Sequence, residues 1–266
     1  MIVDSDFFFV EFLSELLSKR GYQAIKAYDG KEGIGKLEDI TVDILFADLV
    51  LPKIDGKQLF SFIRQKYNGN RFPLVALSGI MIENLGSLDE IEADYFIAKG
   101  PIDKLTIQLN DFIAEMEIQP FTPPADKKIL ATGHIYPRRD AVELVKSLQF
   151  HQAVIECAAV GIIIVDNDTR IINANPAALE IVDRSSTDVI NCPVSDLFEN
   201  RSRAKLADGL ELVMQQKNIE KISFLTNFHS QVMNTIISPI RLADSAVGWV
   251  IVVEPVSQDN RGTRIQ

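Results

Sequence analysis

Apolar residues in the first 116 positions form short runs that alternate with amphipathic stretches. In the first such stretch, Phe8, Phe12, Leu13 and Leu16 have the spacing of one helix face. The runs predict five strands, at Met1–Val3, Gln23–Ala27, Asp43–Ala47, Leu74–Leu77 and Tyr95–Ile97. Five helices are expected to alternate with them, at Phe7–Lys19, Lys31–Glu38, Gly56–Lys66, Ile82–Ile91 and Ile102–Met116. This alternation predicts an α/β fold, a doubly wound parallel five-stranded sheet with helices on both faces.

The pattern breaks after residue 117. The prolines of Gln119–Pro124 cannot continue a helix, and we interpret residues 118–138 as a linker between domains. A helix is expected from about Arg139 to Cys157. Four of its residues, Leu144, Leu148, His151 and Ile155, have 4-3-4 spacing. This is a seam of two turns at most, so dimerisation through it is a hypothesis.

The rest of the second half is predicted to be mainly strands. Gly161–Asp166 and Arg170–Asn173 flank a hairpin turn. Helical fragments follow at Pro176–Val182, Ser195–Phe198 and Arg203–Gln216, and then three β runs at Ile219–Thr226, Gln231–Leu242 and Val247–Val253. This order predicts an α+β domain over residues 139–257, with an antiparallel sheet covered by helices on one face. Residues 258–266 form a polar tail.

Composition narrows the possible partners. The chain has 266 residues and a net charge of −10, with 19 acidic and 12 basic residues before position 117. Phosphate and anionic-lipid surfaces attract clustered Lys and Arg, so we expect neither nucleic acid nor membrane as a partner. Two cysteines and three scattered histidines give no disulfide framework and no zinc pattern. Without an apolar run of 18 residues or a signal peptide, we expect a cytoplasmic protein.

Some of the acidic residues lie at or just beyond the ends of predicted strands. Asp4 follows the first strand, Asp6 lies just beyond it, and Asp48 follows the third. Adjacent parallel strands would bring Asp4 and Asp48 to one edge, where carboxylates repel unless a hard cation such as Mg²⁺ lies between them. The alternative is that each aspartate caps the helix that follows it.

Further residues extend this set in a fixed order. Asp48 is followed by Pro52 and by Asp55-Gly56, Ser78 ends the fourth strand, and Lys99 follows the fifth. Over residues 1–117, this pattern resembles the receiver domain of two-component response regulators, which has a flavodoxin-like fold.

The resemblance implies a role for each residue. Asp48 would be the phosphoacceptor, attacking a phosphohistidine of a sensor histidine kinase or phosphotransfer protein. Asp4, Asp48 and the Val50 carbonyl would hold Mg²⁺, with Asp6 as a further possible ligand. The phosphoryl-binding and switch residues would be Lys99, Ser78 and Phe96.

Two departures leave a competitor open. The family usually has two adjacent acids after the first strand, whereas here the second position is Ser5. The family's Lys-Pro pair is interrupted by Gly100. Both favour a pseudo-receiver that keeps the fold and acts as a phosphate-independent scaffold.

The second domain resembles a PAS domain. The resemblance rests on Gly161–Asp166, on Arg170–Ala178, on Pro193–Phe198 and on the three closing strands. PAS domains sense ligands or dimerise, so the fold alone does not assign a function.

The sequence lacks the residues that bind two known PAS cofactors, flavin and haem. Cys192 is preceded by Asn191, as in flavin photosensors, but the reactive-cysteine position aligns with Val194, and the predicted helix Arg203–Gln216 lacks the histidine that binds haem. Flavin and haem are therefore not expected, and any PAS ligand is unknown. We expect His229 at the surface, Cys157 buried as a small hydrophobe, and three polar residues bonded to backbone groups: Arg170, Asn173 and Asn175.

The expected output follows from these domains. After the PAS segment, Pro255 blocks an immediate helix, and the second domain has no nucleophile–base pair or metal cluster. We therefore expect a response regulator rather than an enzyme. It would signal through PAS-mediated contacts with a downstream protein or as a homodimer. A PAS small-molecule sensor is a further alternative.

Overall fold

The computed structural model describes most of the chain, as two compact units, Met1–Gln149 and Phe150–Gln266. The described residues are 1–67, 72–79, 91–118, 121–123, 128–130, 147, 150–216, 219–229, 231–242 and 245–256. The expected helix at Ile82–Ile91 lies almost wholly outside them, as do Leu144, Leu148 and the tail. In the described part of the chain, no helix is long and apolar enough to cross a membrane.

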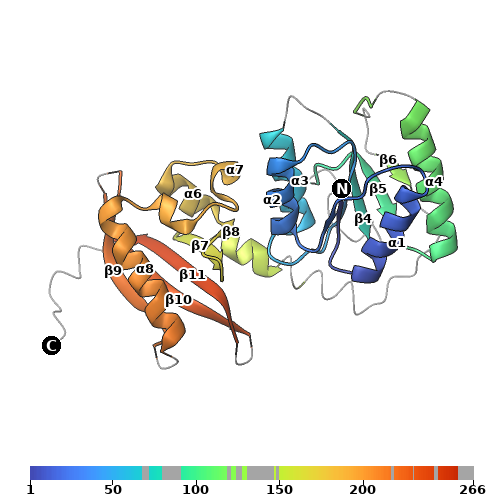
Figure 1. Cartoon of the computed structure of the whole chain (residues 1–266). Coiled ribbons are helices and arrows are strands. Elements are labelled where there is room, and N and C mark those ends of the chain that lie inside the picture. The colour runs from blue at the N-terminus through green and yellow to red at the C-terminus, as the bar shows by residue number, and fades with distance from the viewer. Residues whose placement is uncertain are drawn as a thin grey trace. The chain divides into compact units, whose positions relative to one another are not determined.

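The first unit is a parallel sheet with helices on both faces (Figure 1). Its strands are β1 (Ile2–Val3), β2 (Lys26–Ala27), β3 (Leu45–Asp48), β4 (Leu74–Ser78), β5 (Tyr95–Ala98) and β6 (Lys128–Leu130). The sheet order is β2-β1-β3-β4-β5-β6. The helices are α1 (Phe7–Ser18), α2 (Gly30–Asp39), α3 (Gly56–Lys66) and α4 (Ile102–Ile118). The doubly wound parallel fold predicted for this half is confirmed.

The two faces of this sheet are covered by different helices. In Figure 1, α1 and α4 lie on one face and α2 and α3 on the other. On the first face, Leu13 of α1 and Phe112 of α4 pack with strand residues such as Phe46 and Ile97 in one buried cluster. Alternation along a strand turns Phe96 to the opposite face. Because the helices cover the two faces, the polar residues at the strand ends lie along the open edge of the sheet.

β6 was not predicted. It lies in the expected linker and pairs in parallel with β5, with Phe96 opposite Ile129. A three-residue strand is too short to show a period in the sequence, and pairing with a strand edge can form it without one.

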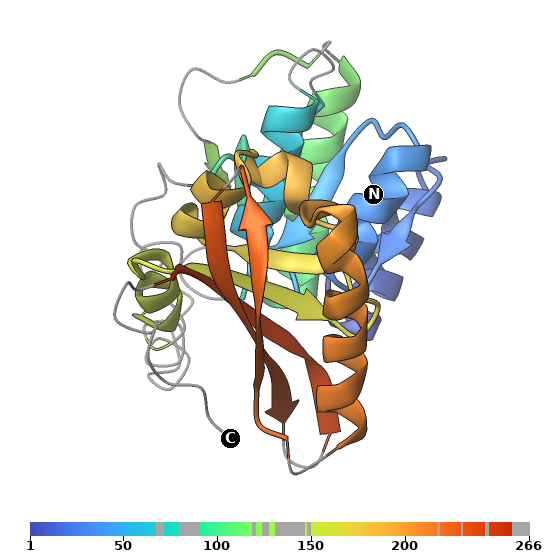
Figure 2. The same ribbon diagram turned by 90° about the vertical axis from the view of Figure 1, so that its left-hand side faces the viewer.

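The second unit is an antiparallel sheet, as predicted, and the helices of residues 176–215 cover one of its faces (Figures 1 and 2). Its sheet order is β8-β7-β11-β10-β9. The strands are β7 (Gly161–Asp166), β8 (Ile171–Ala174), β9 (Ile222–Phe228), β10 (Gln231–Leu242) and β11 (Ser245–Pro255). The helices are α6 (Pro176–Val182), α7 (Ser186–Val189), the 3-10 helix η3 (Val194–Leu197) and α8 (Asn200–Gln215). Residues 150–156 are also helical.

Buried residues alternate along the central strands of this sheet. Ile163 and Val165 of β7 and Ile251 and Val253 of β11 are buried, while the residues between them are partly exposed. One face of the sheet therefore carries the core under the helices.

Candidate phosphoacceptor site

Three side chains from separate strands meet at one edge of the first sheet. The Lys99 Nζ lies 2.5 Å from Asp4 Oδ2 and 2.5 Å from Asp48 Oδ2. Asp4 follows β1, Asp48 ends the neighbouring β3, and Lys99 follows β5 and reaches across the end of β4. The predicted strand-end cluster therefore forms around one ammonium group.

The three charged side chains of this cluster are largely buried, which strengthens their electrostatic interactions. Asp4 is completely buried, and the side chains of Asp48 and Lys99 are only 14% and 17% exposed. Burial raises the pKa of the Asp4 carboxyl above its ordinary value, although the ion pair with Lys99 opposes that shift. The Lys99 Nζ also lies 4.6 Å from the centre of the Phe9 ring, whose face attracts a cation. Phe9 was not singled out by the sequence, because an aromatic residue in the first turn of a helix has no distinctive spacing.

The residues next to Asp4 have local structural roles. The Asp6 amide donates to Asp4 Oδ1 at 2.9 Å, and Asp6 Oδ1 accepts from the amides of Phe8 and Phe9 at 2.9 and 3.3 Å. Asp6 therefore caps α1. For this residue, the structure shows the helix-capping role that the sequence offered as the alternative to binding a metal. Ser5 is exposed.

The loop after β3 holds Asp48 through backbone contacts. The Val50 amide donates to Asp48 Oδ1 at 3.1 Å. Asp55 caps α3 by accepting from the Gln58 amide at 2.7 Å. A Cβ on Gly56 would lie 2.3 Å from the Asp48 carbonyl oxygen, so only glycine fits there without displacing the backbone. The Asp55-Gly56 pair thus starts α3 directly against the backbone of Asp48.

Ser78 and Phe96 lie in the strands that lead to Lys99. Ser78 ends β4 and is buried, and its carbonyl accepts from the Lys99 amide at 2.7 Å. Phe96 is fully buried in β5, opposite Ala76 of β4. The ends of β4 and β5 are therefore joined next to the charged cluster.

The oxygen donors at this edge fit Mg²⁺. Asp4 Oδ2 and Asp48 Oδ2 share one cation partner at 2.5 Å each, so they can approach a single ion together. Mg²⁺ commonly binds through one or two carboxylates and keeps several waters, and receiver domains generally bind it. In the described part of the chain, no three His, Cys, Asp or Glu side chains converge on one point. Any further ligands would be backbone oxygen, water or phosphate.

The polar residues of the second unit serve its backbone. The Asn175 side chain donates to the carbonyls of Ile155, Ala158 and Val160 and accepts from the amides of Ile162 and Ala178. Arg170 donates from its guanidinium to the Asn191 carbonyl. The predicted backbone role is confirmed for these two residues. The backbone role of Asn173 stays a prediction.

The exposure predicted for His229 is confirmed, whereas the burial predicted for Cys157 is not. His229 is exposed, in a turn with φ of 46°, as predicted. The prediction for Cys157 was wrong, because this residue is exposed. It directly follows the helical residues 150–156, whose exposed positions show that this helix does not bury all its sides. Val194, at the position of the flavin-reactive cysteine, is buried.

Comparison with known families decides the identity of both units. The model of the response regulator receiver domain matches residues 1–109, and that of the PAS fold matches residues 149–256. The chain is a receiver domain followed by a PAS domain. Both resemblances drawn from the sequence are confirmed, and the matches to response regulators support a two-component signalling protein.

Relatives of this receiver–PAS chain are distant, and the chain matches only part of each. It is 25% identical over 222 residues to the sensor histidine kinase TmoS of Ectopseudomonas mendocina, covering 79% of this chain and 23% of that protein. It is 28% identical over 148 residues to the uncharacterized transcriptional regulatory protein YcbL of Bacillus subtilis, covering 55% of this chain and 65% of that protein. The chain thus spans less than two thirds of either relative. Among solved structures, the PAS domain of a Colwellia psychrerythraea protein matches 42% of this chain and 98% of its own, with a TM-score of 0.38 and 14% identity.

Proposed function

We propose that this protein is a response regulator whose Asp48 accepts a phosphoryl group from a histidine kinase or phosphotransfer protein. The observation that carries the proposal is the Lys99 ammonium, 2.5 Å from the carboxylates of both Asp48 and Asp4 at the end of the parallel sheet. A carboxylate nucleophile beside a fixed cation suits phosphoryl transfer, because charge on the phosphoryl oxygens needs a positive partner.

In the transfer step, an oxygen of Asp48 forms a bond to phosphorus while the P–N bond of the phosphohistidine breaks. The bonding electron pair stays on the imidazole nitrogen, and Asp48 becomes an acyl phosphate. Lys99 would then pair with a phosphoryl oxygen, and the Ser78 hydroxyl would hydrogen-bond another. Mg²⁺, held by Asp4, Asp48 and the Val50 carbonyl, would supply further positive charge at the phosphoryl group.

The signal would pass from Asp48 to the surface through the ends of β4 and β5, which a hydrogen bond joins. Phosphorylation replaces the single negative charge of the Asp48 carboxylate with nearly two on the phosphoryl oxygens, and these attract the Lys99 ammonium. Because the Lys99 amide is bonded to the Ser78 carbonyl, a shift of Lys99 acts on the ends of β4 and β5 together. We propose that this shift, with Phe96 as the switch aromatic, changes contacts with a downstream protein or the association of the PAS domain. Such an output makes the protein a signalling component rather than an enzyme.

Homodimerisation through the PAS domain is part of the proposal. The sheet face away from the helices carries apolar residues in register, with Ile162 opposite Val252 and Ile164 opposite Val250. Ile236 of β10 lies on the other side of Val252. These side chains are partly exposed, and burying them against a second copy would be favourable. Sedimentation velocity of wild type and Val252→Lys tests this, and equal association of the two would contradict it.

Labelling with a small phosphodonor tests the main proposal. Wild type incubated with phosphoramidate and Mg²⁺ should gain one phosphoryl group by intact mass, and Asp48→Ala should gain none. Asp111→Ala, which removes an exposed carboxylate of α4, is the matched control and should label like wild type. Failure of wild type to label, or labelling of Asp48→Ala, would contradict the proposal.

The competitor is a phosphate-independent scaffold. It is favoured by the exposed Ser5 and by Asp6, which caps α1. A titration with Mg²⁺ discriminates the two functions. Protection of β1 and β3 amides from hydrogen exchange should rise with Mg²⁺ if Asp4 and Asp48 bind it, and should not change in the scaffold.

A further inference from the structure

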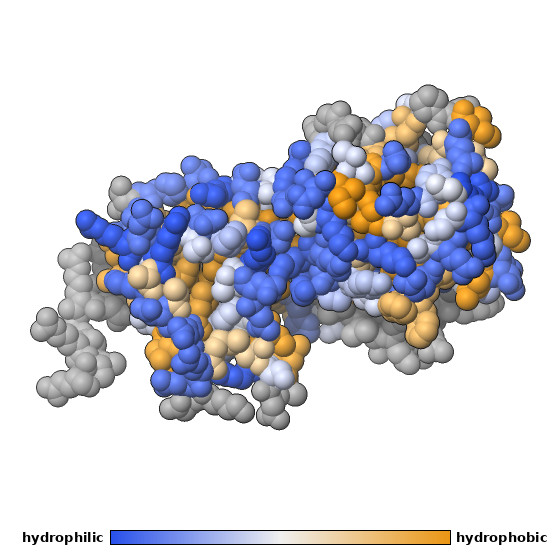
Figure 3. Space-filling model, viewed as in Figure 1, coloured by the Kyte–Doolittle hydropathy of each residue, from blue (hydrophilic) through white to orange (hydrophobic). Residues whose placement is uncertain are grey.

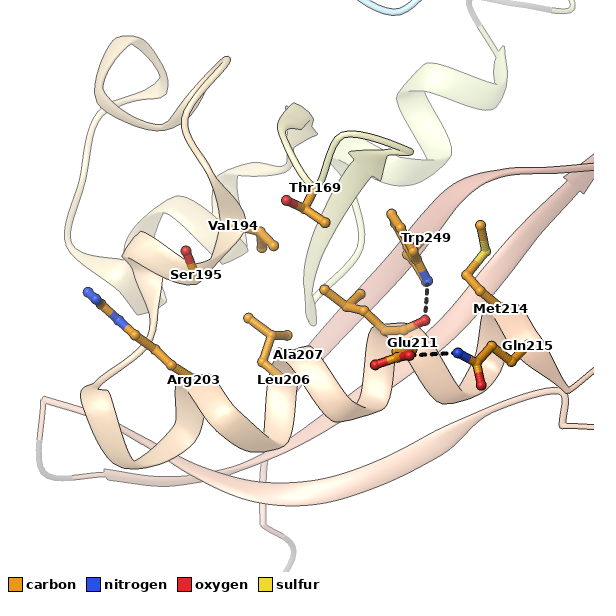
Figure 4. Close-up of a pocket in the computed structure, with 11 residues that line it drawn as sticks. Thr169, Val194, Ser195, Arg203, Leu206, Ala207, Glu211, Met214, Gln215 and Trp249 are labelled. Carbon is orange, nitrogen blue, oxygen red and sulfur yellow. Dashed lines mark hydrogen bonds between the residues drawn. The ribbon is translucent and has the colours of Figure 1, made fainter.

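A groove of about 520 Å³ runs along one flank of α8 in the PAS domain (Figure 4). Its wall on the helix side is formed by Leu206, Ala207, Leu210 and Met214, and Val194 and Trp249 lie across from them. The space-filling view shows hydrophobic residues beside α8, on the side where Figure 1 places β7, β8 and β11 (Figure 3). The volume and the apolar lining are typical of a small-molecule site.

The close packing of α8 explains why free space lies on this flank. A Cβ on Gly209 would lie 2.6 Å from Ile222 Cδ1 and 2.9 Å from Ile237 Cδ1. The helix is therefore pressed against β9 and β10 at Gly209, and no ligand fits between them there. The groove lies on the other flank of the helix and faces Thr169 of the β7–β8 turn.

The floor of the groove is held in place. The Trp249 Nε1 donates to the Leu210 carbonyl at 3.1 Å, which fixes the indole against α8. The preceding Gly248 has a φ of 155°, and a Cβ there would lie 2.1 Å from the Val165 carbonyl oxygen. β11 therefore cannot carry a side chain at Gly248 without moving away from β7. A pre-organised aromatic surface of this kind lowers the cost of binding a flat apolar molecule.

The two ends of the groove differ in charge. Arg203 lies at the N-terminal end of α8, and Glu211 and Gln215 lie toward the C-terminal end (Figure 4). Glu211 Oε1 accepts from the Gln215 side chain at 2.6 Å. Within the described residues, the one polar contact of the Arg203 side chain is from Nε to the Phe198 carbonyl, at 3.0 Å. The terminal nitrogens of Arg203 remain available to an anion.

We propose that this groove binds a small organic anion, with an apolar and preferably aromatic body over Trp249 and Leu210 and its carboxylate or sulfonate at Arg203. The site gives the small-molecule sensor alternative a location and a ligand class. It is independent of phosphoryl transfer to Asp48.

Trp249 is the single tryptophan of the chain, so its fluorescence reports on this groove alone. The full-length protein is titrated with 8-anilinonaphthalene-1-sulfonate, an aromatic anion. We expect saturable quenching of Trp249 with a stoichiometry of one per chain. Arg203→Gln should weaken binding about tenfold, the effect of losing one charged hydrogen bond. Arg201→Gln, exposed on the same helix and outside the groove, should bind like wild type.

Filling the groove gives a second test. Ala207→Phe should abolish binding, while Ala204→Phe, which adds the same bulk at an exposed position outside the groove, should not. Neutral N-phenyl-1-naphthylamine should bind equally to wild type and Arg203→Gln. The absence of binding to wild type, an equal loss in Arg201→Gln and Arg203→Gln, or binding by a folded Ala207→Phe would each overturn the proposal. Asp48→Ala should bind like wild type, so this result is separate from the labelling experiment.

Discussion

The two domains bury polar side chains for different purposes. In the PAS domain, the Asn175 side chain makes five hydrogen bonds, all to backbone groups within 20 residues along the chain. In the receiver domain, buried Asp4 is paired with Lys99 from a different strand, and Lys99 also contacts Asp48. A polar group bonded to nearby backbone fixes a local conformation. Charges that neutralise one another across strands leave groups that can exchange partners, which is what phosphoryl transfer requires.

Replacing Asn175 tests the structural half of this comparison and should have the largest effect. Asn175→Ala leaves several buried backbone groups without partners, so we expect the PAS domain to lose roughly 3–4 kcal/mol of unfolding free energy. Urea titration monitored by Trp249 fluorescence measures this domain selectively. Asn173→Ala should change stability by less than about 0.5 kcal/mol. Similar losses for the two variants would contradict a special role for Asn175.

Gly56 tests whether the receiver site depends on a close backbone approach. Gly56→Ala places a Cβ 2.3 Å from the Asp48 carbonyl oxygen and should destabilise the receiver by roughly 2–3 kcal/mol. Gly35→Ala, in α2 with no atom within 4 Å of the added Cβ, should instead stabilise it by up to about 1 kcal/mol. Hydrogen exchange of β1 and β3 peptides measures both. The same sign for both substitutions would refute this explanation of Gly56.

The sequence predicted the candidate site well, because charged residues at the ends of apolar strands are easy to recognise. Asp4 and Asp48 were predicted to meet because parallel strands end at one edge of a sheet, and the resemblance to receiver domains added Lys99; all three side chains do meet. A short strand offered no comparable signal. β6 has three residues and forms by pairing with β5, and β2 is restricted to Lys26–Ala27, within the longer Gln23–Ala27 that was predicted.

The groove of the PAS domain could not be predicted for a different reason. Its lining residues are apolar and spaced like those of an ordinary helix core, so the sequence does not distinguish filled from free space. Only the contacts that an added Cβ on Gly209 would make show which flank of α8 is closely packed. The error at Cys157 has a similar origin, because burial depends on what packs against a helix rather than on the residue type.

Removing the shared cation tests the functional half of the comparison. Lys99→Met leaves Asp4 and Asp48 facing each other, and we expect the receiver to lose about 2 kcal/mol, less than a fully buried pair because Lys99 is 17% exposed. Phosphodonor labelling of Asp48 should slow as well. Lys104→Met removes an exposed lysine of α4 and should alter neither property. Unchanged stability and labelling in Lys99→Met would show that the ion pairs are incidental.

Asp4 gives the smallest and most specific effect, a pH dependence. Its pKa is raised by burial, so between the ordinary value of about 3.9 and the raised value the folded protein binds more protons than the unfolded one. Stability contributed by protonated Asp4 is therefore lost as pH rises through that window, and the full cost of the buried charge is present above it. Asp4→Asn should accordingly be more stable than wild type at pH 7, with an advantage that shrinks as pH falls through that window and wild-type Asp4 takes up a proton. Hydrogen exchange corrected for intrinsic rates, or urea titration by circular dichroism, measures the difference at each pH, with Asp111→Asn as the exposed control. An advantage that stays constant with pH, or a variant less stable than wild type at pH 7, would mean that the ion pair with Lys99 outweighs the cost of burying Asp4.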